Sequence, residues 1–310
     1  MTTTPPVPAT EEFAGTKPRK LTKTEKRAIA AKTKLSSPWA SGIAIVLAIL
    51  WTIPTFGLLI SSFRPEQDIK TSGWWTFFQD PQVTLDNYNE VLFGSGTAFS
   101  TYFVNSIVIT LPAVIIPITI ALLAAYAFAW IDFRGSAILF VAVFALQIVP
   151  IQVTLIPLLQ QYVRWDLAGS YWTVWLSHSI FALPLAIFLL HNFMKEIPRS
   201  LVEAARVDGA GHVKIFFQVL LPLLVPAIAA FSIFQFLWVW NDLLVALTFA
   251  GGTANVAPLT VRLAELSGTR GTEWQLLSAG AFIAMAIPLV VFLSLQRYFV
   301  RGLLAGSVKG

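Results

Sequence analysis

The sequence is poor in charge and contains no cysteine. Only 12% of its 310 residues are Asp, Glu, Lys or Arg, whereas a soluble domain usually carries about 25%. Hydrophobic residues make up 56%. Without cysteine the chain has no disulfide, no thiol nucleophile and no thiolate ligand for zinc. This composition predicts a membrane protein.

Nucleotide-binding and catalytic motifs are also missing. There is no G-x-x-x-x-G-K-[ST] phosphate loop and not one Gly-Lys dipeptide, so the chain cannot bind ATP by that device. Neither H-E-x-x-H nor G-x-S-x-G occurs. His178, His191 and His212 are far apart and lack carboxylates at ligand spacing, which indicates ordinary structural roles. We therefore expect a non-enzyme with no metal or cofactor site of its own.

What the sequence does contain is six long uncharged runs. Each can cross about 30 Å of hydrocarbon, which needs roughly 20 residues. Backbone groups in lipid must be satisfied internally, so the runs are predicted to be helices. The fold class expected is an all-α polytopic membrane protein with six transmembrane helices, near residues 40–62, 103–129, 137–159, 172–192, 221–248 and 276–297.

The distribution of Lys and Arg predicts the orientation. With the N-terminus inside, 16 of the 21 basic residues fall in inner segments and five in outer ones. Because basic residues gather on the cytoplasmic side, both termini are expected there. The basic stretch 17–34 is expected either to lie near anionic membrane lipid or to act only as a solvated tail that fixes topology.

A polar segment between the fourth and fifth runs faces the cytoplasm in this topology. Residues 198–209, PRSLVEAARVDG, are predicted to form a short helix that begins at Pro198 and is capped by Gly209. Leu201, Ala204, Ala205 and Asp208 would share one face, where two alanines allow close approach. Glu203 and Arg206 could pair with each other or with a partner. A second helix is expected to begin near His212. This predicts a helical platform that a second protein can grip.

The same segment resembles a known motif. Glu203-Ala204-Ala205, three residues, Gly209, nine residues and Val219-x-Leu221-Pro222 are similar to the EAA loop, E-A-A-x₃-G-x₉-I-x-L-P, of permease subunits in binding-protein-dependent ABC importers. Val219 in place of Ile is the one departure. The stretches 197–201, 208–210, 240–242 (WND) and 302–310 resemble the carbohydrate-uptake, maltose-type branch of this family. The resemblance covers residues 40–310 and implies the type I importer permease fold.

The resemblance implies four parts. Residues 1–38 would be a basic cytoplasmic arm, partly disordered, and 39–100 the first helix with an extracytoplasmic loop. Residues 101–297 would be the transmembrane core, with its coupling loop at 198–222. Residues 298–310 would be a cytoplasmic tail. The loop at 250–275 would probe the cleft of a binding protein, or be a plain connector, and residues 63–101 would also face that protein.

Partners and roles follow from the same resemblance. A separate ATPase dimer would bind ATP and Mg and dock on the coupling helix, and this chain would bind no cofactor and no nucleic acid. A second permease subunit, an extracytoplasmic binding protein and a sugar complete the system, with α-glucosides such as maltose as first candidates. The coupling residues implied are Glu203, Ala204, Ala205, Arg206, Asp208, Gly209 and Gly211, and the ATPase-contacting tail residues are Gly306, Ser307 and Lys309.

The substrate path is less constrained by the sequence. Polar side chains inside spans usually face the bundle interior, although hydrogen bonds between helices explain them equally well. The candidates are Asn105, Gln147, Gln152, Gln235, Trp238, Asn241 and Asp242. Trp238 and Trp240 are expected to be able to stack on a sugar ring. The alternatives left open are an ABC permease for a non-sugar solute and an ATP-independent carrier or channel.

Overall fold

The structure of the protein is a computed structural model, and it describes residues 38–94, 99–268 and 273–307. The described residues are helical throughout their regular structure and contain no strand. The chain divides into two compact units, Met1–Phe56 and Gly57–Gly310. The described part of the first unit is the first three quarters of helix α2.

Five helices are long and apolar enough to cross a membrane. Their apolar composition over more than 20 residues gives each the length that a bilayer requires. They are α2 (Pro38–Ser62), α5 (Phe99–Trp130), α8 (Tyr171–Glu196), the continuous helix His212–Trp240, and α14 (Trp274–Ser307), whose apolar part is Trp274–Gln296. These correspond to five of the six spans expected from the sequence.

The expected third span, 137–159, is not one straight helix. It is divided into α6 (Ser136–Ala145) with η2 (Leu146–Ile148), and α7 (Ile151–Arg164), which meet at an angle of 99°. Val149 is extended at the break, as the residue before a proline tends to be, and Pro150 cannot donate the N–H that would continue the helix. The expected span at 137–159 is therefore divided between two helices, and the described residues hold six candidate spans if this bent pair is one broken span, or five if it is a re-entrant loop.

The fifth span also differs from the expected 221–248. The helix begins at α10 (His212–Lys214), passes through the π-helical turn η3 (Ile215–Leu220) and continues as α11 (Leu221–Trp240). The π turn directly precedes Pro222, which has no N–H to donate to the carbonyl four residues earlier. The helix ends at Trp240, and a separate helix, α12 (Leu244–Ala250), follows.

Short helices occupy the connections. After α2 come α3 (Glu66–Thr71), η1 (Trp74–Phe78) and α4 (Asp86–Phe93). Helix α9 (Arg199–Val207) lies between α8 and α10, and α13 (Leu259–Ser267) lies between α12 and α14. The connection at 250–275, expected as a loop, is therefore partly helical.

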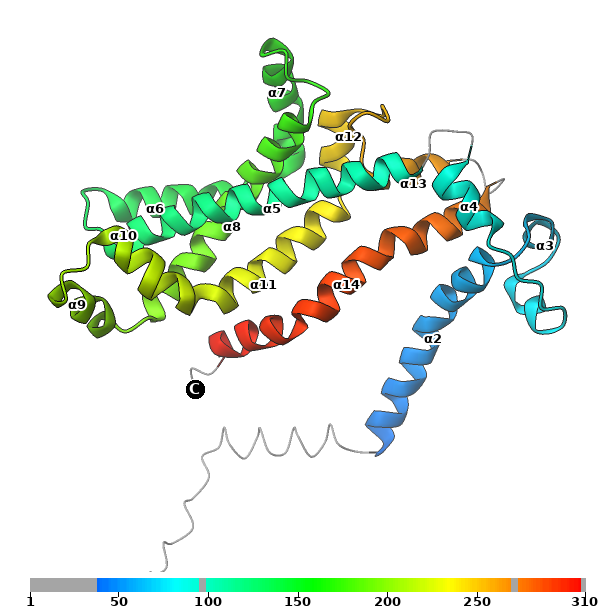
Figure 1. Ribbon diagram of the computed structural model, residues 1–310, viewed down its shortest axis with the longest axis horizontal. Coiled ribbons are helices and arrows are strands. Elements are labelled where there is room, and N and C mark those ends of the chain that lie inside the picture. Colours follow the sequence, from blue (N-terminus) through cyan, green and yellow to red (C-terminus); the bar gives the residue numbers. More distant parts are fainter. Residues whose placement is uncertain (1–37, 95–98, 269–272, 308–310) are drawn as a thin grey trace, which may run out of the picture. The chain divides into compact units, whose positions relative to one another are not determined.

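The core is built where α5 packs against α8 and α11, while α14 packs along α11 (Figure 1). Ala121 and Ala125 of α5 and Ala186 of α8 have no exposed surface. Small side chains let the helix backbones come close, which is how helices associate inside a bilayer, where burial of apolar surface supplies little drive. The bundle is consequently held by tight packing together with specific hydrogen bonds.

Three of those hydrogen bonds compensate for prolines within the spans. A proline leaves the carbonyl four residues before it without its helical donor. Pro112, Pro117 and Pro288 do this to Val108, Ala113 and Ala284. In each case a side chain of a neighbouring helix donates instead: Trp175 Nε1 to Val108 O at 3.0 Å, Gln235 Nε2 to Ala113 O at 3.1 Å, and Trp240 Nε1 to Ala284 O at 2.9 Å.

The hydrogen bond from Gln235 to Ala113 O predicts that replacing Pro117 reduces the stability lost when the Gln235 amide is removed. Gln235→Leu should lower the free energy of unfolding by about 0.6–2 kcal/mol, because Ala113 O loses its donor within an apolar surrounding. In a Pro117→Ala background the same change should cost clearly less, since the alanine introduced in place of Pro117 has an N–H that restores the helical bond. Thermal unfolding of the purified chain in detergent measures both.

The matched control is Trp175→Phe, whose cost should fall with Pro112→Ala but not with Pro117→Ala. If the cost of Gln235→Leu were the same with and without Pro117, the amide would be stabilising something other than the freed carbonyl.

Candidate functional site

Helix α9 has a C-terminus defined by its sequence. Gly209 has a φ of +77°, a conformation that glycine adopts without steric cost. Its N–H donates to Arg206 O at 3.0 Å, and the N–H of Ala210 donates to Ala205 O at 2.9 Å. This pair of hydrogen bonds is the Schellman motif, which satisfies the last carbonyls of a helix and reverses the chain. The reversal places α9 directly before α10.

One face of α9 is attached to the bundle and the other is open. Val202 is buried in the same hydrophobic cluster as Met194 and Ile215, and Ala205 is half-buried against it. Leu201, Ala204 and Val207 are exposed, and Val207 retains 88% of its surface. Asp208 and Gly211 are exposed too. Of the two adjacent alanines, Ala204 thus belongs to the open face, and Ala205 mainly supports the helix.

The start of α10 is tied to the end of α5. Tyr126 OH lies 2.7 Å from Nδ1 of His212, and the Tyr126 ring packs edge-on against Phe216. Phe216 and Ile215 are buried in the π turn. The polar connection and the apolar contact together fix α10 to the bundle, so a displacement of α9 would be transmitted to the helix that continues to Trp240.

Four charged side chains surround a small notch beside α9. The notch has a volume of about 100 Å³ and is lined by Asp132, Arg199, Glu203 and Arg206 together with apolar residues. Among the described residues no ion pair joins Glu203 to Arg206. Both charges are exposed. This surface therefore offers charges of both signs next to the exposed apolar residues of α9.

The expected tail residues lie at the end of α14. Gly306 and Ser307 continue the backbone of this helix to its last residue, and Lys309 lies outside the described residues. The basic stretch of residues 17–34 also lies outside them.

Three of the seven candidate path residues come together. Gln147 of η2 and Gln235 and Trp238 of α11 line one cavity of about 200 Å³, and apolar side chains of α7, α8 and α11 complete the wall. Gln147 also lines a larger apolar groove of about 640 Å³ along the break between η2 and α7. No charged side chain lines either space. Both could accommodate a neutral, partly apolar solute.

The remaining candidates lie elsewhere. Gln152 is exposed on α7, and Asn241 is exposed and donates to Leu237 O at 2.7 Å. Asn105 is buried: its Nδ2 donates to Ala254 O at 2.7 Å and Ala257 O at 3.0 Å. Its Oδ1 accepts from Tyr171 OH at 2.6 Å. Asn105 thus holds the segment before α13 against α5.

Trp240 does not face the cavity, contrary to the stacking role considered from sequence. It is 3% exposed, its indole lies flat against Phe236, and its N–H is bonded to Ala284 O. Trp238 is half-buried and packs edge-on against His178 at a centroid distance of 5.1 Å. Of the two tryptophans, only Trp238 lines the cavity.

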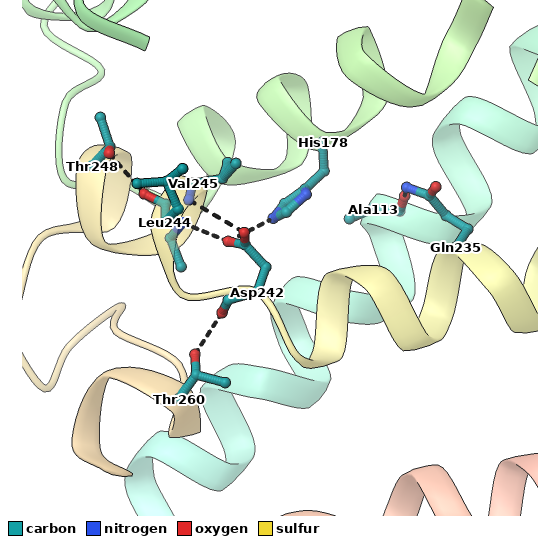
Figure 2. Close-up of polar contacts among 9 residues, drawn as sticks. Ala113, His178, Gln235, Asp242, Leu244, Val245, Thr248 and Thr260 are labelled. Atoms are coloured by element: carbon teal, nitrogen blue, oxygen red, sulfur yellow. Dashed lines mark hydrogen bonds and ion pairs between the residues drawn. The ribbon is translucent and has the colours of Figure 1, made fainter. Parts of the chain in front are cut away.

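Asp242 occupies the break between α11 and α12 (Figure 2). Its carboxylate accepts hydrogen bonds from Val245 N at 3.3 Å and Ala246 N at 2.8 Å, and Thr260 Oγ1 donates to its carbonyl at 2.6 Å. His178 Nε2 lies 3.6 Å from Asp242 Oδ2, and the imidazole is fully buried. No local spacing in the sequence connects these two residues, so the pair is not predicted from the sequence.

Within the described parts of the chain, no three His, Cys, Asp or Glu side chains are grouped so that they could hold a metal ion. The residues that do cluster are amides, indoles and apolar side chains. Such a set can bind and orient a neutral solute but carries no nucleophile, acid or base at the cavity wall.

Comparison with known proteins places the chain in a family. Residues 117–304 match the family described as binding-protein-dependent transport system inner membrane component, and the chain belongs to this family. The platform at α9, the cavity and the break at Asp242 all lie within the matched region. The resemblance drawn from the EAA pattern is thereby confirmed: the chain is an integral membrane permease component of an ABC importer.

Two relatives cover most of the chain. It is 55% identical over 269 residues to the osmoprotective compounds uptake permease protein GgtD of Synechocystis sp., covering 86% of this chain and 90% of the relative. It is 39% identical to the alpha-glucoside transport system permease protein AglG of Rhizobium meliloti, covering 88% and 97%. A chain in the crystal structure of a bacterial importer of alginate shares the fold, with a TM-score of 0.68 at 18% identity over 90% of this chain and 99% of that one.

The capping role of Asp242 can be tested directly. Asp242→Ala should lower the free energy of unfolding by about 0.5–2 kcal/mol, because the first N–H groups of α12 lose their acceptor. Asp242→Asn keeps a side-chain oxygen and should cost less. Thermal unfolding in detergent measures the difference, with Asn241→Ala as a neighbouring exposed control. Equal losses for the Ala and Asn variants would instead point to the negative charge beside His178.

Proposed function

We propose that this permease translocates a small neutral sugar, with α-glucosides as the first candidates, in an importer driven by a separate ATPase. The observation that carries the proposal is the exposed helix α9, which ends on Gly209 and joins the helix that lines the cavity. In this arrangement α9 is the docking surface for the ATPase, a binding protein delivers the solute, and a second permease subunit completes the pathway. Both termini face the cytoplasm, in keeping with the distribution of basic residues.

A mechanical argument supports the coupling. The helix His212–Trp240 has 29 residues, which at about 1.5 Å per residue is long enough to cross the hydrocarbon completely. One end joins the platform through Gly211, and Gln235 and Trp238 lie near the other. A partner that binds α9 differently in two states shifts the equilibrium between them by its differential affinity, and this helix connects that surface to the cavity residues.

The docking face fits a protein groove. Leu201, Ala204 and Val207 present a narrow apolar strip, and Glu203 and Arg206 flank it with exposed charges. Apolar anchors surrounded by polar groups are typical of the centre of a protein interface. The small side chain of Ala204 projects little from the helix, so a partner's surface can reach the helix backbone there.

The cavity chemistry supports a neutral solute. Its polar groups are the two amides of Gln147 and Gln235, and Trp238 supplies an aromatic face. Amides hydrogen-bond to hydroxyl groups without requiring charge, and the apolar face of a sugar ring packs on an indole. The name of one relative refers to α-glucosides, in agreement with this class, and the name of the other refers to osmoprotective compounds without specifying a sugar. An α-glucoside that also protects against osmotic stress would satisfy both.

A non-sugar osmoprotectant is the second candidate. It is favoured by the more similar of the two relatives, whose name specifies no sugar. The anionic group of a zwitterionic solute is held most strongly by a cationic side chain, and none lines the cavity, so the sugar remains the first candidate.

The contact with the binding protein is proposed for α13. Ala264, Glu265 and Ser267 are exposed on this helix, whereas Leu259, Val261 and Leu266 are buried. The preceding segment is fixed by Asn105 and by Ser106, whose Oγ accepts from Leu259 N at 2.8 Å. Removing the whole connection would therefore disturb the core, and single substitutions on the exposed face are the better probe.

Reversing one charge on the platform should uncouple the importer. We expect Glu203→Lys to reduce solute uptake at least about tenfold, since the loss of a contact of about 1.4 kcal/mol with the ATPase suffices for that factor. The exposed position predicts unchanged thermal stability. Uptake and ATP hydrolysis are measured in the same reconstituted vesicles.

Glu90→Lys on α4, in the connection expected to face the binding protein, is the matched charge reversal away from the platform and should leave ATP hydrolysis measured without that protein unchanged. Glu203→Gln should give an intermediate loss if charge matters. Normal uptake by Glu203→Lys would remove α9 from the coupling role.

The whole assignment is tested by affinity-tagging this chain in its host and identifying the proteins that co-purify. We expect an ATPase with a phosphate loop, a second permease and a binding protein. Titration calorimetry of that binding protein with trehalose, sucrose, maltose and glycine betaine then separates the two solute classes. Recovery of the chain alone, under conditions that preserve other membrane complexes, would favour an ATP-independent carrier.

A further inference from the structure

The connection after α2 carries an unusual apolar surface. We call residues 72–85 the aromatic segment. Within it Trp75 is 63% exposed, Phe78 65%, Val83 65% and Leu85 60%, although no spanning helix includes them. Asp80 is its single charged residue, whereas the preceding helix α3 carries Glu66, Asp68 and Lys70. Charged and apolar residues are thus separated into adjacent parts of one connection.

A buried arginine holds the aromatic segment in shape. Arg64 is 4% exposed and donates to Gly73 O at 2.8 Å, Ser72 Oγ at 2.9 Å and Thr76 Oγ1 at 3.1 Å. Burying a guanidinium is costly unless its donors are satisfied. Here all three bonds go to the turn that begins the segment, so the exposure of Trp75 and Phe78 is imposed by a specific fold of the chain.

The segment is also fixed to the end of α2. Asn87 Nδ2 donates to Ser62 O at 3.1 Å and Arg64 O at 2.8 Å, and Thr84 N donates to Phe63 O at 2.7 Å. A Cβ on Gly57 would lie 2.6 Å from Nε1 of Trp74, so glycine is needed for the indole to pack against the helix. The aromatic segment is therefore anchored directly to the end of a membrane span.

The length of α2 places its C-terminal end at the membrane surface. Its 25 residues extend about 37 Å at 1.5 Å per residue, somewhat more than the roughly 30 Å of hydrocarbon. Residues that are fixed to this end must lie at the level of the lipid headgroups. Tryptophan and phenylalanine are favourable there, because the rings reach the acyl chains while polar groups stay hydrated.

We propose that the aromatic segment, residues 72–85, is seated in the lipid interface, with Trp75 and Phe78 inserted at the boundary between headgroups and acyl chains. In the orientation proposed above this is the extracytoplasmic leaflet. The segment fixes the depth of the outer end of α2, while the charged face of α3 remains in water. Lipid fits this surface better than the binding protein, because interfaces that form transiently between proteins are about as polar as the rest of a surface.

Site-directed spin labelling tests the proposal, and the absence of native cysteine makes single labels unambiguous. Phe78→Cys and Gln67→Cys, the latter on the exposed face of α3, are labelled with a nitroxide in the full chain reconstituted with its co-purifying subunits in phosphatidylethanolamine–phosphatidylglycerol vesicles. Collision rates with oxygen and with a water-soluble nickel chelate are measured for both. Val83→Cys provides a second position in the segment if Phe78→Cys fails to assemble.

The expected result is an oxygen-to-nickel collision ratio several-fold higher at position 78 than at position 67, unchanged when the binding protein is added. A ratio at position 78 equal to that at position 67 would show that the segment is in water and overturn the proposal. Low collision rates with both reagents, or immobilisation of the label by the binding protein, would show a protein partner and overturn it as well. None of these outcomes depends on the identity of the solute.

Discussion

The requirement that every backbone polar group in an apolar environment find a partner governs this fold. Hydrogen bonds within the helices satisfy most backbone groups, but each proline leaves one carbonyl without its helical donor. At Pro112, Pro117 and Pro288 the freed carbonyl is reached by Trp175, Gln235 and Trp240. Because each donor comes from another helix, every one of these prolines also determines which helices lie side by side. A local defect in one helix thereby specifies tertiary packing.

The same requirement shapes the irregular segments. Where the fifth span ends, the carboxylate of Asp242 receives the N–H groups that begin α12, and Thr260 reaches its carbonyl (Figure 2). Asn105 likewise receives and gives hydrogen bonds that hold the chain before α13. Polar side chains within spans are often interpreted as lining the path of a solute. Here Asn105 and Asp242 serve the backbone, and Gln235 does so while also lining the cavity.

The features that the sequence predicted correctly depend on residues that lie close together in the chain. Apolar run length placed five helices, and the identities of Pro198 and Gly209 placed the ends of the short helix α9 within about a turn. The failures were of two kinds. The run 137–159 carries no charge, and of its two prolines Pro150 lies at the 99° break whereas Pro157 lies inside α7. The contacts of Gln235 with Ala113 and of His178 with Asp242 join residues far apart in the chain, which one sequence without homologues cannot pair.

The fifth span has a continuous helical part, which is followed by a break at Asp242, and the two sides of the break can move differently. From His212 to Trp240 the helix is continuous, so the cavity residues Gln235 and Trp238 share one helix with His212, which follows α9 after the turn at Gly209. Beyond Trp240 the chain turns at Asp242, and α12 packs against α8. A movement of α9 would therefore reach the cavity residues along one helix, whereas α12 would respond through the break at Asp242 and through the contacts of Asp242 with His178 and Thr260. A partner bound at α9 and a partner bound beyond Trp240 would each act on a different helical segment, because the helix is interrupted between them.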